Sequence, residues 1–254
     1  MRRPRDIRLK APYLKRIWLD PARVEEKDSY PFTLPLFRHS DFELAFERAV
    51  TIIVGENGAG KSTLLEGIAA YAGYDNAGGG KGYMPVDHSR AVERQGGKLG
   101  EALRASWLPK IANGWFFRAE SFFSVARYLD TAALDANEPP PDFLSHSHGE
   151  SFLRFFEERC QRQGIYIFDE PESALSPRRQ IEFLKLLQRM DESGICQVIM
   201  ATHSPLLMAH PGATLLGLDR RGLAPITLRE TAHYKLLKEF CDDPEYFIES
   251  MTQI

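Results

Sequence analysis

The chain has 254 residues, of which 43% are hydrophobic, and its formal net charge is −3 at pH 7. This size and apolar content fit a single domain with a full core, and the net charge gives the chain as a whole no attraction to nucleic acid. No apolar run approaches the length of a membrane span, so we expect a cytoplasmic protein without direct membrane insertion.

The first 16 residues form a basic segment that is almost free of acidic residues. Its cations are Arg2, Arg3, Arg5, Arg8, Lys10, Lys15 and Arg16. Clustered cations of this kind either contact the phosphates of a nucleic acid or belong to a solvated, disordered tail. The tail is the simpler interpretation, and both stay open.

A phosphate-binding loop follows the first predicted strand. Residues 49–54 form an apolar run typical of a buried strand, residues 62–70 have the apolar spacing of a helix, and Gly55-Glu-Asn-Gly-Ala-Gly-Lys-Ser-Thr63 lies between them. Backbone N–H groups of such a loop surround phosphates, its lysine reaches the β- and γ-phosphates, and its serine hydroxyl faces Mg²⁺. The residues predicted to bind the nucleotide here are Asn57, Gly58, Ala59, Gly60, Lys61, Ser62 and Thr63, with Ser62 also at the metal.

The next stretch contains a glycine-rich excursion and a predicted helix start. Residues 73–100 contain many glycines and are predicted to be a mobile excursion. Ser147-His-Gly-Glu-Ser151 precedes an apolar face at residues 152–160, and we expect that helix to end at Gly164. Ser147 and Glu150 have the spacing of a capping box, and Gly149 allows close approach of a ligand. A plain helix cap and an anion-binding helix start both fit this stretch.

Two further predicted strands end in residues able to carry hydrolytic chemistry. Residues 165–168 are apolar and lead to Asp169 and Glu170, a carboxylate suited to Mg²⁺ followed by one suited to act as general base. Residues 197–201 form a second apolar run that leads to His203. Between the two strands, residues 177–190 are predicted to be a helix ended by Gly194. The apolar face of that helix is expected to consist of Ile181, Leu184, Leu187 and Met190.

The tail is predicted to contain two short strands, at residues 214–218 and 225–228, and then acidic helical segments. Three cysteines, Cys160, Cys196 and Cys241, match neither a disulfide framework nor a zinc pattern, and we expect them to be reduced and mostly buried.

In their order, these stretches resemble the ABC-type ATPases, in particular a stand-alone predicted-ATPase group related to the RecF, SMC and OLD (overcoming-lysogenisation-defect) proteins. The resemblance covers most of the chain between Val50 and Pro205. It implies an α/β fold: a P-loop NTPase with an ABC-type head, a mixed, largely parallel core sheet and a helical signature lobe at approximately residues 100–163. We expect the whole chain, residues 1–254, to be one such domain.

The resemblance also implies residue roles. Lys61, Glu170 and His203 would be catalytic, His203 as the switch histidine, while Ser147, Gly149 and Glu150 would form the signature that contacts the nucleotide of a second protomer. Here Ser147-x-Gly149-Glu150 departs from the family's Leu-Ser-Gly-Gly-Gln, and Ser176 replaces the aspartate of the D-loop.

Two elements of the family pattern have no firm match. Glu120 stands where the family has its Gln-loop residue near the metal, and it equally fits an ordinary helix start. An aromatic residue that stacks on adenine is expected upstream of the phosphate loop, with Phe32, Phe37 and Phe42 as candidates.

The sequence therefore predicts an ATP- and Mg²⁺-dependent hydrolase that forms an ATP-dependent homodimer and drives a conformational change in an unknown protein partner. A link to nucleic acid or to defence is the first interpretation. The alternative is the energising subunit of a membrane transporter. The interval between the phosphate loop and the signature shows no sustained heptads, which excludes an SMC-type coiled-coil arm within it.

Overall fold

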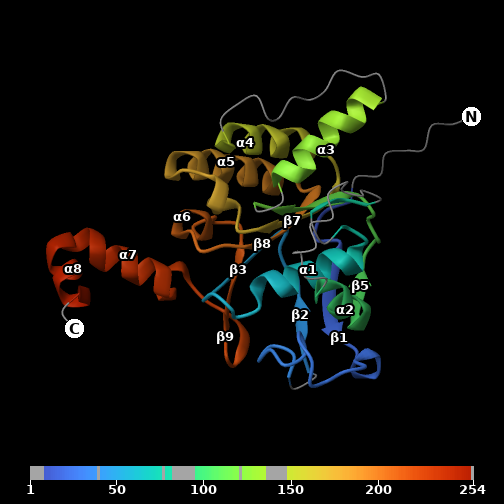
Figure 1. The fold of residues 1–254 in the computed structure, drawn as a ribbon, viewed down its shortest axis with the longest axis horizontal. Helices are drawn as coiled ribbons and strands as arrows, with labels where there is room; N and C mark the ends of the chain where they lie inside the picture. Colours follow the sequence, from blue (N-terminus) through green and yellow to red (C-terminus); the bar gives the residue numbers. More distant parts are fainter. Residues whose placement is uncertain are drawn as a thin grey trace, which may run out of the picture.

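The computed structural model of the protein describes residues 9–38, 41–75, 78–81, 95–119, 122–135 and 148–252. Within these residues, the largest sheet has seven strands in the order β10-β9-β3-β8-β7-β6-β4 (Figure 1). The five central strands are parallel, and the edge strands β10 and β4 pair antiparallel. The strands are β3 (Val50–Gly55), β4 (Gly79–Gly80), β6 (Gly114–Arg118), β7 (Gly164–Asp169), β8 (Cys196–Ala201), β9 (Thr214–Asp219) and β10 (Gly222–Pro225).

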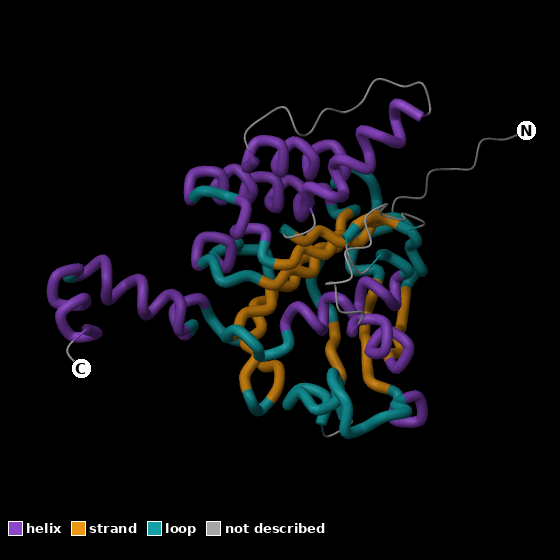
Figure 2. The backbone as a smooth tube through the Cα atoms, in the orientation of Figure 1, coloured by secondary structure: helices purple, strands orange, loops and turns teal. Residues whose placement is uncertain are grey.

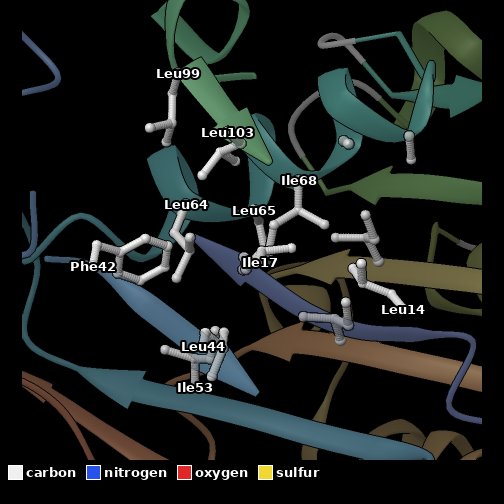
Figure 3. Packing of buried hydrophobic residues seen from close by; sticks show 14 of the residues in the cluster. Leu14, Ile17, Phe42, Leu44, Ile53, Leu64, Leu65, Ile68, Leu99 and Leu103 are labelled. Carbon is white, nitrogen blue, oxygen red and sulfur yellow. The ribbon is translucent and has the colours of Figure 1, made fainter. Parts of the chain in front are cut away.

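A smaller antiparallel sheet, β2-β1-β5, packs with two helices over one face of the large sheet. Its strands are β1 (Leu14–Leu19), β2 (Glu43–Ala45) and β5 (Leu103–Trp107), and the helices are α1 (Lys61–Ala72) and α2 (Gln95–Ala102). Figure 3 shows Leu64, Leu65 and Ile68 of α1 pointing toward apolar side chains of β1, β2 and α2. This cluster fixes α1, and therefore the phosphate loop before it, against the sheet.

Helices of the second layer cover the other face of the large sheet (Figures 1 and 2). They are α3 (Phe122–Asp135), α4 (His148–Arg159), α5 (Pro177–Ser193) and the short α6 (Pro205–Met208). Alternation along β7 separates the two cores, since Ile165 and Ile167 belong to the first cluster while Tyr166 and Phe168 belong to the second. All six residues of β7 are buried, as the central strand of a sheet covered on both faces should be.

The chain ends in two helices that extend from the body. After β10 and the 3-10 helix Leu228–Glu230, α7 (Ala232–Asp242) and α8 (Pro244–Thr252) run outward, as Figures 1 and 2 show. Neither helix has a buried residue. Several of their large apolar side chains are exposed, namely Leu236, Leu237, Phe240, Tyr246, Ile248 and Met251.

The predicted α/β fold is confirmed, and the strands around the phosphate loop, Asp169 and His203 lie within a residue or two of their expected bounds. Three details of the predicted helices, strands and loops were wrong. Helix α4 ends at Arg159, and Gly164 begins β7 because its amide already pairs with Ile195 O. The second tail strand lies at Gly222–Pro225, earlier than expected. The glycine-rich stretch contains β4 and α2, and the rest of it lies outside the described residues.

The buried face of α5 also differs from the expected one. Phe183, Leu186, Leu187 and Met190 are buried, whereas Ile181 is 48% exposed. Phe183 packs against the rings of Phe156 and Phe168, so the largest apolar side chain of the helix decides which stripe faces the core. Among the described residues of the range expected for the helical lobe, β5 and β6 are strands, and α3 and α4 belong to the helical layer. The single-domain assignment stays a prediction.

The basic N-terminal segment is described from residue 9 onward. Arg16 belongs to β1, pairs with Glu43 at 3.2 Å and lies over the Trp18 ring, so it is not an unopposed cation of a tail. Residues 1–8 lie outside the described part. No helix among the described residues combines the length and apolar character needed to cross a bilayer.

Candidate functional site

The hydrogen-bonded register places the candidate site in one row across four adjacent strands. Ile53 of β3 is opposite Ala201 of β8, Ala201 is opposite Asp169 of β7, and Asp169 is opposite Arg118 of β6. The carboxyl ends of these parallel strands meet at one edge of the sheet, the usual place for ligands in open α/β sheets. Motifs that are far apart in sequence therefore converge here.

The phosphate loop adopts a conformation that needs its glycines. Gly58 and Gly60 have φ of 76° and 101°, and Gly60 is the N-cap of α1 without a side chain to cap it. A Cβ on Gly55 would lie 2.5 Å from Leu218 O, so the strand end has no room for one. The free N–H groups at the start of α1 are thus left for an anion.

Lys61 is held in the centre of this loop. Its ammonium Nζ donates to the carbonyls of Gly55 at 2.9 Å and Glu56 at 3.1 Å, and the residue is 4% exposed. Burial lowers the pKa of Lys61, and the carboxylates of Glu170 and Asp169 oppose that shift. The residue thus lies where phosphate oxygens could replace the two carbonyls as its partners.

Ser62 and Asp169 form the candidate metal position. The Ser62 hydroxyl donates to Asp169 Oδ1 at 3.0 Å. Burial raises the pKa of Asp169 to about 6, and Arg118 and Ser62 act in the opposite direction. Among the described residues, no group of three or more His, Cys, Asp or Glu side chains is arranged for a metal ion. A hydroxyl and one carboxylate are nevertheless hard oxygen ligands of the kind Mg²⁺ takes alongside phosphates and water, so the pair fits this ion.

Arg118 is a member of the site that the sequence did not indicate. Its Nη1 lies 2.7 Å from Glu66 Oε1 of α1, and its Nε lies 3.6 Å from Asp169 Oδ2. All three side chains are at most 14% exposed. One buried cation therefore compensates two buried carboxylates beside the candidate metal position.

Glu170 and His203 face each other at the ends of β7 and β8. His203 Nε2 lies 3.3 Å from Glu170 Oε1, and both side chains are partly exposed. Glu170 has a left-handed backbone with φ of 48°, and it is the one described non-glycine residue with positive φ. Such a conformation is costly for a glutamate and is typical of functional sites. The backbone N–H of His203 donates to Glu172, which fixes the turn after β8.

A second histidine completes the surroundings of His203. His233, in the first turn of α7, has its Nε2 2.8 Å from His203 Nδ1. Burial lowers the pKa of His233, and the charges of His203 and Lys61 lower it further. No motif marks this residue in the sequence, because α7 follows the last strand pair and lies outside the family pattern.

The signature residues lie apart from this row. Glu150 pairs with Arg179 of α5 at 3.6 Å, and a Cβ on Gly149 would lie 3.3 Å from Ala174 O, so both residues contact the α5 side of the molecule. Ser147 and Glu120 lie outside the described residues, and their assignments stay predictions.

The three candidate adenine-stacking residues are not available to a ligand. Phe32, Phe37 and Phe42 are 6%, 1% and 6% exposed and belong to the first core cluster. Tyr30 is 41% exposed instead, and its hydroxyl hydrogen-bonds the hydroxyl of Thr63 in the first turn of α1. An exposed aromatic at the phosphate loop is thus present, two residues before the nearest predicted one.

A cavity of about 670 Å³ adjoins the outer side of the phosphate loop. Its walls come from loop residues, the β9–β10 turn and the start of α7, including His233. Lys61, Ser62, Asp169 and Glu170 are not among the residues that line it.

Comparisons with known proteins agree with the loop and acidic strand. Residues 36–96 match the profile of a family described as "AAA domain", and residues 131–209 match one described as "AAA domain, putative AbiEii toxin, Type IV TA system". A search of curated proteins finds no match.

Two of the solved structures to which the chain is similar come from different protein types. The SMC head domain from Thermotoga maritima is 16% identical, with 85% of this chain and 99% of that one covered and a TM-score of 0.47. The cbiO1 protein from Clostridium perfringens, part of the ABC transporter complex cbiONQ, is 19% identical, with 95% and 100% covered and a TM-score of 0.45.

The phosphate loop lies between β3 and α1, and the acidic end of β7 lies next to it. The two family profiles span these two motifs. On these observations, the chain is a P-loop ATPase with two segments, residues 36–96 and 131–209, that match AAA-type domain profiles.

Proposed function

We propose that the protein is a cytosolic, Mg²⁺-dependent ATPase in which the row of groups at the end of the sheet hydrolyses ATP. The observation that carries this proposal is the pairing of Ser62 with Asp169 at 3.0 Å beside the pairing of His203 with Glu170 at 3.3 Å, directly at the phosphate loop. A metal-ligand pair and an acid–base pair are the two parts that phosphoryl transfer to water requires.

Each residue has a separable role in the proposed reaction. The loop N–H groups and Lys61 bind the phosphates, and Tyr30 offers a ring to the base. Ser62 and Asp169 would hold Mg²⁺, which when bound neutralises charge on the phosphates. Glu170 accepts the proton of the attacking water as that oxygen bonds to the γ-phosphorus and the bond to ADP breaks. His203 lies beside Glu170, where its Nε2 proton can orient the γ-phosphate oxygens.

The proposed active form is a dimer closed over ATP. Support comes from the signature residues Gly149 and Glu150, which contact the α5 side of their own chain instead of its phosphate loop. Together with Ser147, they would complete the site of a second copy, where a helix start favours the γ-phosphate.

We propose a defence-linked or nucleic-acid-linked output for the cycle of closure and reopening. The description of the profile that matches residues 131–209 names a type IV toxin–antitoxin system, which supports this direction. The receiver of the conformational change would be a separate protein partner. A pull-down with a hydrolysis-deficient variant in ATP tests this: recovery of a nuclease, toxin or nucleic acid supports the proposal, and recovery of a permease supports the transporter alternative.

The chemistry is tested by two variants with opposite effects. Lys61→Ala should lose tight ATP binding, because it removes a ground-state phosphate contact. Glu170→Gln should keep ATP binding and lower kcat by about 10²–10⁴-fold, because it removes a general base. Glu47→Gln, at an exposed position before the phosphate loop, is the matched control and should behave as wild type. Wild-type turnover by Glu170→Gln would show that Glu170 is not the base.

A further inference from the structure

The His203 ring is held from both sides by groups from different elements. Its Nδ1 hydrogen-bonds His233 Nε2 at 2.8 Å, and its Nε2 lies 3.3 Å from Glu170 Oε1 without a hydrogen bond between them. The two imidazole rings are tilted by 57° with centroids 5.0 Å apart, so their contact is an edge hydrogen bond and not a stack. Glu170, His203 and His233 thus form a continuous chain that runs from the end of β7 to the start of α7.

The chain of contacts limits where protons can lie. Two imidazole nitrogens at 2.8 Å need one donor and one acceptor between them. If His203 Nδ1 were the donor of a neutral ring, its bare Nε2 would face a carboxylate oxygen, and two acceptors would repel each other. If His233 Nε2 donates, His203 Nδ1 accepts and its proton lies on Nε2, on the side of Glu170, where the contact is electrostatically favourable without being a hydrogen bond. The imidazolium form also carries a proton on Nε2. Both favourable forms therefore present a proton donor toward the hydrolytic site.

We propose that His233 is a positioning residue for ATP hydrolysis, which fixes the ring plane of His203 and keeps a proton on His203 Nε2. The inference rests on the proposed role of His203. The lowered pKa of His233 agrees with it, because a neutral ring can be the single donor that the geometry requires.

His233 also ties α7 to the hydrolytic site. Helix α7 has no buried residue, and the contact with His203 is the one side-chain hydrogen bond that joins α7 to the sheet within the described part of the chain. Displacement of α7 would therefore remove the partner of His203 Nδ1 without disturbing the core. This hydrogen bond therefore couples the position of the C-terminal arm (α7 and α8) to the orientation of the His203 ring.

Two substitutions at one position separate the hydrogen bond from packing. His233→Phe keeps a ring and removes the donor, and it should lower kcat about tenfold with KM for ATP unchanged, as expected for one hydrogen bond used in the reaction. His233→Gln keeps an N–H donor and should retain most of the wild-type kcat. Lys235→Ala, exposed on the same helix, controls for changes in α7 alone. Equal kcat for His233→Phe and wild type would overturn the proposal, as would a Gln variant no better than Phe.

A double variant tests whether His233 acts through His203. In a His203→Ala background, His233→Phe should cause no further loss of kcat, because the ring that it positions is gone. If the two substitutions lowered kcat by factors that multiply in the double variant, His203 and His233 would act independently, and the proposal would be overturned. The single variants also test the role of His203 separately from the positioning role of His233. An inactive His203→Ala with a fully active His233→Phe refutes only the positioning role, whereas full activity of His203→Ala refutes the role of His203 as well.

Discussion

Arg118 determines the electrostatics at the base of the site. It is the partner of Glu66 at 2.7 Å and lies 3.6 Å from Asp169, and none of the three side chains has more than 14% exposure. Buried ion pairs of this kind gain little over an apolar core, but the loss of one member removes charge compensation from its buried partners. The arginine thus allows two acidic residues to remain close to the phosphate loop.

Arg118→Met should therefore destabilise the protein by about 3–5 kcal/mol, measured as the free energy of unfolding in urea. The double variant Arg118→Met with Glu66→Gln also removes one of the two buried carboxylates that lie beside Arg118, and it should recover part of that loss. A single variant as stable as the wild type, or a double variant less stable than the single one, would show that the cluster contributes no net stabilisation.

The three thiols differ in their surroundings. Burial raises the pKa of Cys160 well above its usual value and that of Cys196 to about 11, whereas Cys241 on α7 is exposed. The thiolate is the reactive form, so a raised pKa and burial both slow modification. At pH 8 the native protein should release one equivalent of thionitrobenzoate quickly from Ellman's reagent, and the unfolded protein three. Cys241→Ser should abolish the fast phase, and a persistent fast phase would contradict the assignment.

The chemistry of the site was predictable where residues follow one another in a motif, since the loop and the pair Asp169–Glu170 are each set by adjacent backbone positions. Arg118 and His233 were missed because their partners are distant in the chain: Glu66 is 52 residues from Arg118, and His203 is 30 residues from His233. Tyr30 was missed because exposure decides its availability, and the apolar pattern indicates only that Phe32, Phe37 and Phe42 are aromatic.

At the scale of elements, α1 and α2 approach each other closely through small residues. A Cβ on Gly100 would lie 2.8 Å from the Ala70 Cβ and 3.2 Å from Gly67 O, and one on Gly67 would lie 2.6 Å from Leu99 Cδ2. The two helices therefore pack backbone to backbone, which places Leu99 in the first core cluster (Figure 3). This contact supports α1 from the side opposite the sheet.

Gly100→Leu should push α2 away from α1 and cost about 1–3 kcal/mol, because the added atoms meet backbone that cannot move aside. Glu101→Leu introduces the same side chain at the exposed next position and should change stability little. The melting temperatures of the two variants give the comparison. Equal melting temperatures would show that α2 can shift without loss.

The face of α5 illustrates a limit of sequence patterns at this scale. A period of 3.6 residues is satisfied both by the predicted stripe with Ile181 and by the observed one with Phe183. The choice depends on the rings of Phe156 and Phe168, which come from α4 and β7. A pattern within one helix cannot contain that information.

At the scale of the whole molecule, the fold separates the two halves of the proposed site. The phosphate loop with Lys61 lies at the end of the sheet, while Glu150 of α4 pairs with Arg179 in the helical layer. Closure over ATP would need two copies, each of which supplies the half that the other lacks.

Glu170→Gln with ATP and Mg²⁺ should therefore have the mass of a dimer in light scattering, and the wild type without nucleotide that of a monomer. The further change Ser147→Arg should restore the monomer, because it blocks the helix start that would meet the γ-phosphate of the other copy. Gln188→Arg, on the exposed side of α5, is the control and should leave the dimer intact. If Glu170→Gln with ATP and Mg²⁺ stayed monomeric at every protein concentration, the closed dimer would be ruled out.

The register that aligns Ile53, Ala201, Asp169 and Arg118 across the strands should affect which mutations the protein tolerates. Backbone pairing spaces these strands about 4.8 Å apart and turns alternate side chains to opposite faces, so position along each strand determines what a residue can do. Loss of a single codon within β7 would turn the carboxylate away from Ser62 while leaving every side chain type in place. In a deep mutational scan, in-frame deletions in β7 should be tolerated far less than substitutions at the same positions, whereas deletions in α8, which buries nothing, should be neutral.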